Sequence, residues 1–163
     1  MQRPVHVDVQ VAMELPGVPA APDIRRWLEY AVAEVGNDSG RQVELSVRIV
    51  DEAESRALNK RYRDRDNATN VLSFPLSEEG LNDPPAELPR TLGDIVICGP
   101  VVAREADEQG KTSADHWAHL LVHGALHLMG YDHETDDEAR EMEALEARIL
   151  AQAGVENPYK TRD

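Results

Sequence analysis

Residues 116–133 have the sequence HWAHLLVHGALHLMGYDH, and we expect the rest of the chain to pack around the helix that this segment forms. Its apolar residues fall on nearly every side of a helix, which is typical of a helix buried in a core. The exception is a stripe of histidines that lies within about an 80° arc of one face at 100° per residue. These histidines are His116, His119, His123 and His127. Unpaired imidazoles are costly in a core, so the stripe needs partners.

The spacing of the last histidines points to a metal ion. His123 and His127 are four residues apart, so both side chains reach one point beside the helix. Gly130 then lets the chain reverse, and His133 can return to the same point. Three neutral imidazoles suit one Zn²⁺ ion with a fourth position open for water, as in catalytic sites. We therefore expect these three histidines to be zinc ligands, and His119, upstream, to support them or to be satisfied in the core.

The rest of the chain supplies strands and helices around this helix. Period-two alternation predicts strands at 5–11, 43–49, 71–76 and 92–97, and Pro75 suggests an edge position for the third. Apolar periodicity and capping signals predict helices at 23–36, 52–62, 100–110, 113–130 and after Thr135, with Ser113 as a cap. Strands mostly precede helices, so we expect one α+β domain over residues 1–163, with a mobile loop at 77–91.

Charge and composition restrict the class of function. The net charge of −14 argues against a broad basic surface, and seven aromatic residues argue against an extended base-stacking platform. Residues 56–65, RALNKRYRDR, nevertheless hold five basic residues and one acid, a local net charge of +4. Lys60, Arg61 and Arg63 in this segment could present cations to a polyanion. For Lys60 and Arg61 we favour a solvated helix end or diffuse attraction of RNA. With one cysteine, no signal peptide and no transmembrane stretch, we expect a cytoplasmic protein without a membrane partner.

Several polar residues have both a functional and a structural interpretation. Asn70 and Ser73 could orient a phosphate or ribose, or could cap a turn. Asp132 could orient a ligand imidazole or cap the turn between the ligands. Residues 134–146 contain seven acids and one arginine, which we interpret as the solvated outer face of a helix.

Two resemblances follow from these motifs. The spacing H-x3-H-x2-G-x2-H resembles the metzincin protease signature, but the general-base glutamate that follows the first histidine there is Gly124 here. The sequence HGALHLMGYDH is instead similar to the YbeY family of bacterial metal-dependent endoribonucleases. LNKRYRDRDNATNVLSFP at 58–75 and LGDIVIC at 92–98 resemble two further blocks of that family in the same order.

The YbeY resemblance implies an α+β fold with a mixed sheet. With the elements above, that means about four strands and about five helices, including a zincin-like metal-binding helix. It also implies metal-dependent cleavage of single-stranded RNA, with Arg63 functionally important beside the three histidines. The implied roles are rRNA maturation, notably at the 16S rRNA 3′ end, and ribosome quality control, with the small ribosomal subunit and its assembly factors as partners.

Several alternatives stay open at this point. The attacking group could be water activated by the metal or the 2′-hydroxyl of the RNA. The chain could instead be another zinc hydrolase, such as a peptidase or amidase. It could also be a ribosome-assembly factor whose metal stabilises the fold.

Overall fold

The computed structural model describes residues 5–35, 42–76, 90–132 and 134–159. Within these residues the α+β class, with four strands and five helices, is confirmed. The elements in chain order are β1 (Val5–Val11), α1 (Ala21–Val35), β2 (Val43–Val50), α2 (Glu52–Arg63), β3 (Val71–Pro75), β4 (Arg90–Cys98), α3 (Gly99–Gln109), α4 (Ser113–Leu128) and α5 (Asp136–Gln152).

The sheet is mixed and has the strand order β1-β2-β4-β3. β1, β2 and β4 are parallel neighbours, and β3 pairs antiparallel with β4. β3 is therefore an edge strand, as Pro75 suggested, because a proline removes a backbone donor that a central strand would need. The outer edge of β3 has no strand partner among the described residues.

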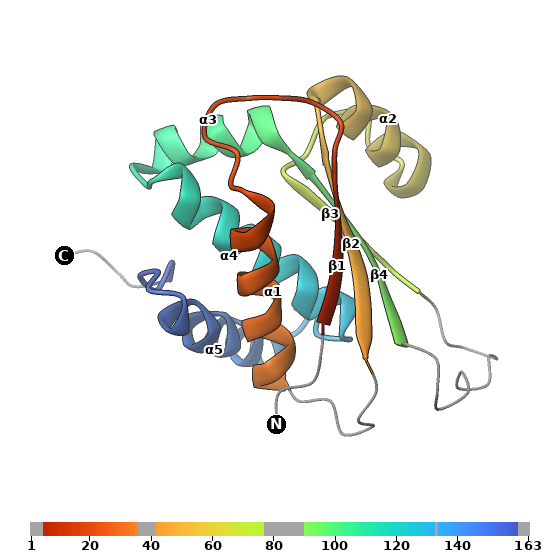
Figure 1. Ribbon diagram of the computed structural model, residues 1–163. Helices are drawn as coiled ribbons and strands as arrows, with labels where there is room; N and C mark the ends of the chain where they lie inside the picture. Colours follow the sequence, from red (N-terminus) through yellow and green to blue (C-terminus); the bar gives the residue numbers. More distant parts are fainter. Residues whose placement is uncertain (1–4, 36–41, 77–89, 133, 160–163) are drawn as a thin grey trace.

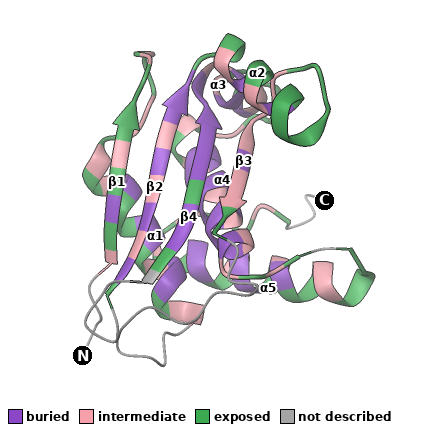
Figure 2. Cartoon of the chain, turned by 90° about the vertical axis from the view of Figure 1, so that its right-hand side faces the viewer, coloured by how far each residue is buried: buried purple, intermediate pink, exposed green. Residues whose placement is uncertain are grey.

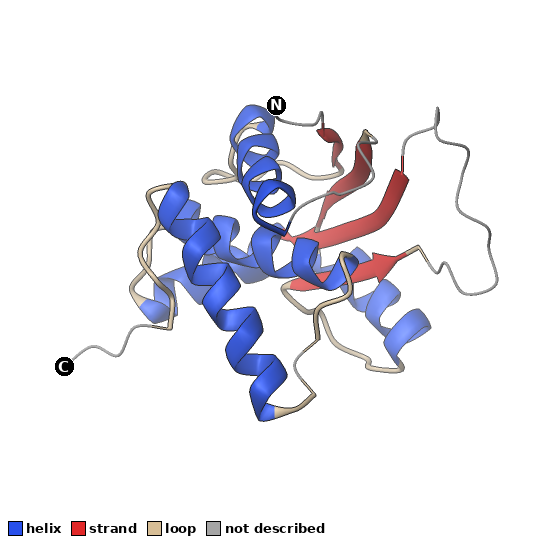
Figure 3. Ribbon diagram, turned by 90° about the horizontal axis from the view of Figure 1, so that it is seen from below, coloured by secondary structure: helices blue, strands red, loops and turns tan. Residues whose placement is uncertain are grey.

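The helices form two unequal layers around the sheet. α1, α3, α4 and α5 lie to one side of it, while α2 lies on the other side (Figure 1). The larger core lies between the sheet and α1, α4 and α5. Figure 3 shows most of the helices grouped on one side of the strands, with one helix on the other side. A smaller core beneath α2 includes Val50, Leu72, Val96 and Cys98.

α4 is the most enclosed helix. Trp117, Leu121, Val122, Ala125 and Leu126 are at most 1% exposed, so apolar residues on several sides of α4 are buried. Figure 2 shows purple, buried residues that alternate with pink ones along β2 and that make up most of β4, whereas β1 is largely exposed. In the described part of the chain, no helix is both long and apolar enough to cross a membrane.

Three local expectations need correction or lie outside the described residues. The N-cap of α4 is Thr112, whose side chain accepts a hydrogen bond from Asp115 N, while Ser113 is the first helical residue and donates to Gly17 O. Arg90 and Thr91 already belong to β4 rather than to a loop. The remainder of the expected 77–91 loop, residues 77–89, and the expected ligand His133 lie outside the described residues.

Candidate functional site

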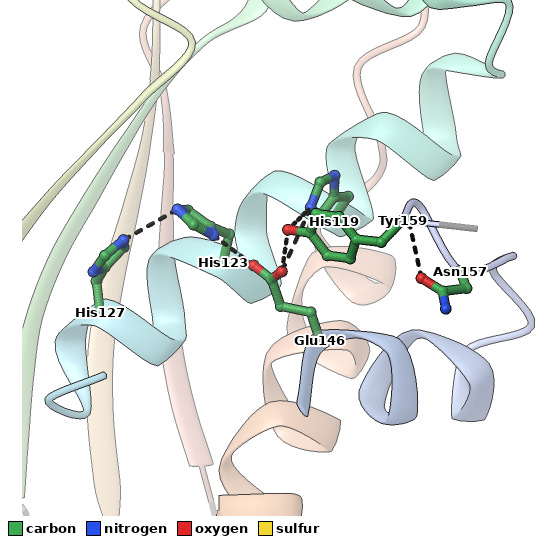
Figure 4. A network of polar contacts seen from close by, with 6 residues as sticks. All are labelled: His119, His123, His127, Glu146, Asn157 and Tyr159. Carbon is green, nitrogen blue, oxygen red and sulfur yellow. Dashed lines mark hydrogen bonds and ion pairs between the residues drawn. The ribbon is translucent and has the colours of Figure 1, made fainter. Parts of the chain in front are cut away.

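His123 and His127 present their ring nitrogens to one another on the side of α4 (Figure 4). Their Nε2 atoms are 3.0 Å apart, and the ring planes are nearly perpendicular, at 83°. Both side chains are partly exposed, although the helix that bears them is buried. The four-residue spacing therefore brings the two histidines together as the sequence predicts.

Glu146 of α5 holds the other nitrogen of His123. Its Oε1 lies 2.5 Å from His123 Nδ1, and the carboxylate side chain is 0% exposed. Burial alone would raise the pKa of Glu146, but the polar hydrogens of His119, His123 and Tyr159 outweigh burial and hold that pKa at about 2. The ionised carboxylate can only accept, so His123 Nδ1 donates. In a neutral imidazole this leaves the lone pair on Nε2, where it faces His127.

Tyr159 joins the network from the segment that follows α5. Its hydroxyl donates a short hydrogen bond to Glu146 Oε2 and lies 3.1 Å from His119 Nε2. Burial raises the pKa of Tyr159, and the neighbouring carboxylate raises it further, so the hydroxyl stays protonated as the donor. His119 Nε2 is 3.8 Å from Glu146 Oε2, beyond hydrogen-bond distance but close enough for its polar hydrogen to help lower the pKa of Glu146. His119 thus lies in the polar surroundings of His123, as one of its two interpretations predicts.

The donor atoms present fit a divalent metal ion. Two nitrogens bound to one tetrahedral Zn²⁺ at about 2.0–2.1 Å would be about 3.3 Å apart, close to the observed 3.0 Å between the Nε2 atoms. A carboxylate on the far nitrogen is the usual partner of a metal-binding histidine. The described residues hold no group of three histidine, cysteine, aspartate or glutamate side chains arranged for a metal. They supply two of the three expected ligands.

His116, the first histidine of the stripe, belongs to a separate network. Its Nε2 lies 2.9 Å from Glu105 Oε1 of α3, and its side chain is 4% exposed. Glu105 also accepts from Asn70 Nδ2, at 3.0 and 3.3 Å, and Asn70 Oδ1 accepts from Val71 N at 2.6 Å. Asn70 therefore caps the start of β3 and links it to α3, and it also lines the cavity described next.

A cavity of about 560 Å³ brings Arg63 and Ser73 to the histidines. Arg63, the last residue of α2, donates from Nη2 to Ser73 O at 2.8 Å, which places its guanidinium at the outer edge of β3. Ser73 Oγ donates to Gly124 O of α4 at 3.2 Å. The cavity is lined by residues that include Arg63, Asn70, Ser73, His119, His123, His127, Asp132 and Tyr159. Lys60 and Arg61 are exposed on α2 and do not line it.

Gly124 has a steric reason to be glycine. A Cβ there would lie 3.1 Å from Ser73 Oγ and 3.3 Å from Ile95 Cγ2, so α4 packs directly against β3 and β4. A glutamate at this position would enter the sheet rather than the cavity. The protease interpretation therefore lacks both the base and the space for it.

Sequence reasoning missed Glu146 and Tyr159. Glu146 falls in the acidic run 134–146, which we interpreted as solvated, but it is 0% exposed. The available signal was periodicity, because Glu146 lies four residues after Met142 and three before Ile149, both of which are buried. Tyr159 has no comparable local signal.

Comparisons with known proteins show the family to which the chain belongs. The family model described as Endoribonuclease YbeY matches residues 15–154. A protein named Endoribonuclease YbeY from Halorhodospira halophila is 60% identical over 88% of this chain and 90% of its own length. Relatives of the same name from Alkalilimnicola ehrlichii and Stenotrophomonas maltophilia are 56% and 52% identical, covering 88% and 96% of this chain and 84% and 95% of their own lengths.

A solved structure supports the fold independently. The solution structure of TM1509 from Thermotoga maritima superposes with a TM-score of 0.55 at 24% identity. The match covers 96% of this chain and 99% of that one. At this identity the likeness supports the fold and no finer statement.

Proposed function

Since the chain belongs to the Endoribonuclease YbeY family, we propose that it is an endoribonuclease that cleaves single-stranded RNA with the help of one Zn²⁺ ion. The observation that most supports this proposal is a single cavity lined by both a cation, Arg63, and the histidine pair His123 and His127. A cation can bind a phosphodiester and stabilise the charge of the transition state, and a Lewis acid can promote its hydrolysis. The biological role we propose is rRNA maturation at the 16S rRNA 3′ end and ribosome quality control in the cytoplasm, together with the small subunit and its assembly factors.

In the proposed site His123, His127 and His133 hold the metal. A metal held there would supply Lewis-acid chemistry to the phosphodiester and would lower the pKa of the attacking water or 2′-hydroxyl. Glu146 keeps the proton of His123 on Nδ1, so that Nε2 faces the cavity as a ligand. Tyr159 donates to the second oxygen of that carboxylate, His119 contacts the Tyr159 hydroxyl, and the Glu146 side chain is 0% exposed.

Arg63 binds the phosphate in this proposal. One of its terminal nitrogens is already fixed by Ser73 O, so the direction of the guanidinium plane is set before the substrate arrives. Its other N–H groups remain available to donate to phosphate oxygens in the bidentate geometry that guanidinium favours. This preorganised cation is suited to the charge that develops on the phosphoryl group in the transition state.

The test is cleavage of a labelled single-stranded RNA by the purified protein, loaded with Zn²⁺ or stripped by a chelator. We expect His127→Ala and Arg63→Ala to lose cleavage, while His6→Ala and Arg26→Ala, which change exposed residues on β1 and α1, keep it. Cleavage that persists in both site variants would come from a contaminating nuclease and would overturn the proposal.

The ends of the products identify the attacking group. Attack by water yields no cyclic phosphate, whereas attack by the 2′-hydroxyl can yield a 2′,3′-cyclic phosphate. A substrate with a single 2′-deoxy nucleotide at the cleaved position separates the two routes, because only the second route needs that hydroxyl.

A further inference from the structure

An aromatic ring lies exposed at the end of α2, next to the site. Tyr62 is 52% exposed, although it is a large and partly apolar side chain. Its ring meets the ring of Phe74 of β3 edge to face, with centroids 5.3 Å apart and planes at 69°. Phe74 anchors Tyr62 to the sheet and leaves much of the tyrosine ring open to solvent. We call this pair the Tyr62 platform.

Cations surround the platform, in a protein whose net charge is −14. The guanidinium carbon of Arg61 lies 5.2 Å from the centre of the Tyr62 ring, and that of Arg63 lies 5.4 Å from the centre of the Phe74 ring. Arg65 is exposed directly after the helix. Arg56 is paired with Asp66 at 2.7 Å, but no ion pair among the described residues joins Arg61, Arg63 or Arg65 to a carboxylate.

The platform is continuous with the cavity. Arg63 packs against Phe74 on the α2 side of the sheet, donates to Ser73 O at the outer edge of β3, and lines the cavity of the histidines. An RNA strand that passes over this edge of β3 would meet the histidine pair, then Arg63, then the open ring of Tyr62. Alternating phosphates and bases match that order of cation and aromatic ring.

We propose that the Tyr62 platform is a stacking subsite for one base of the RNA, close to the phosphate that Arg63 binds. This inference rests on the proposed function. A single open ring flanked by cations suits a nucleobase and its phosphates, because every base has a π-face that stacks on an aromatic side chain without sequence preference. A stable protein partner would need a larger face, of about 800 Å² on each side.

The experiment compares cleavage kinetics of the zinc-loaded wild type, Tyr62→Ala, Tyr62→Leu and Tyr62→Phe. Stacking on one aromatic ring predicts that Tyr62→Ala and Tyr62→Leu raise KM about 5- to 100-fold with kcat within about twofold, and that Tyr62→Phe stays near the wild type. Tyr62→Leu keeps an apolar contact with Phe74, so a loss in both variants does not reflect a damaged fold. The matched control is Val11→Ala, which shortens an exposed apolar side chain on a different element, β1.

A second measurement locates the base. RNAs with one abasic nucleotide are tested position by position, and we expect one position to weaken cleavage by the wild type and to add no further loss in Tyr62→Ala. A wild type that cleaves RNA while Tyr62→Ala and Tyr62→Leu keep its KM would refute the subsite and leave the proposed function intact. A wild type that cleaves no RNA would refute the proposed function itself.

Discussion

Replacing Glu146 by glutamine tests how the buried carboxylate supports the proposed metal site. The change keeps the shape of the side chain and removes its charge. The 2.5 Å contact with His123 Nδ1 then becomes a neutral hydrogen bond, which is about half as strong as a charge-assisted one. An amide placed there can also donate to His123 Nδ1, which would favour the tautomer with its proton on Nε2 and block that atom as a ligand.

The expected effect is on metal affinity rather than on the fold. Loss of such a partner typically weakens metal binding about 10- to 100-fold. A 30-fold loss corresponds to about 2 kcal/mol. At a Zn²⁺ concentration 1,000 times the wild-type Kd, the metal stabilises the wild type by about 4 kcal/mol and would stabilise the variant by about 2 kcal/mol. The metal-free protein should lose less stability, because it loses only the charge-assisted bonds to Glu146, whereas the metal-loaded protein also loses part of its metal-binding free energy.

The assay is Zn²⁺ titration against a chromophoric chelator, with urea unfolding measured with and without the metal. Glu141→Gln is the matched control, since it makes the same chemical change at an exposed position of the same helix. Zinc affinity of Glu146→Gln within twofold of the wild type would refute the reasoning. So would an equal loss of stability in the metal-free and the metal-loaded protein, since that would give Glu146 a role in folding alone.

Three further predictions concern other parts of the molecule. Burial lowers the pKa of His116, although the hydrogen bond to Glu105 opposes this. As the pH falls below about 6.5, His116 is therefore protonated in the unfolded chain before it is protonated in the folded protein. The free energy of unfolding should therefore fall between pH 7.5 and 5.5. The urea midpoint of His116→Gln should fall less over this range than that of the wild type, and an equal fall would contradict the assignment. Burial raises the pKa of the Cys98 thiol, which is 1% exposed, so a thiol reagent should react only as fast as the protein unfolds. Immediate reaction of the folded protein at pH 8 would disprove this. Gly124→Val should lower the unfolding free energy by about 1–3 kcal/mol through overpacking against Ser73 and Ile95, and wild-type stability in urea would exclude that close contact.

The sequence predicted the elements of the fold well because each has a local signal. Val43, Leu45, Val47 and Ile49 alternate along β2 and are all buried. Asp51 accepts from Glu54 N at the start of α2, as its position before the helix predicts. The apolar surroundings of the histidine stripe marked α4 as a core helix, and the structure confirms this.

The sequence could not predict which distant groups satisfy a buried polar atom. Glu146 looks like a surface acid because burial of a carboxylate is normally unfavourable. Here the hydrogens that offset burial come from His123, 23 residues away, and from Tyr159, in the segment after the helix. For Asn70 the sequence left two roles open, and its link to Glu105 of α3 depends on how two helices and a strand pack. The ligand role of His133 stays a prediction.

The enclosure of α4 gives the two sides of the cavity different dynamics. Backbone amides of a helix buried on nearly every side exchange with solvent only when the whole domain opens, whereas those at an exposed helix end exchange by local fraying. His123 and His127 therefore sit on a scaffold that keeps its geometry for the lifetime of the folded state. Arg63 ends α2, whose last backbone amides should exchange by local fraying even though Ser73 O holds the guanidinium of Arg63. Hydrogen exchange should therefore distinguish the slowly exchanging helix of the histidine pair from the faster exchanging end of α2.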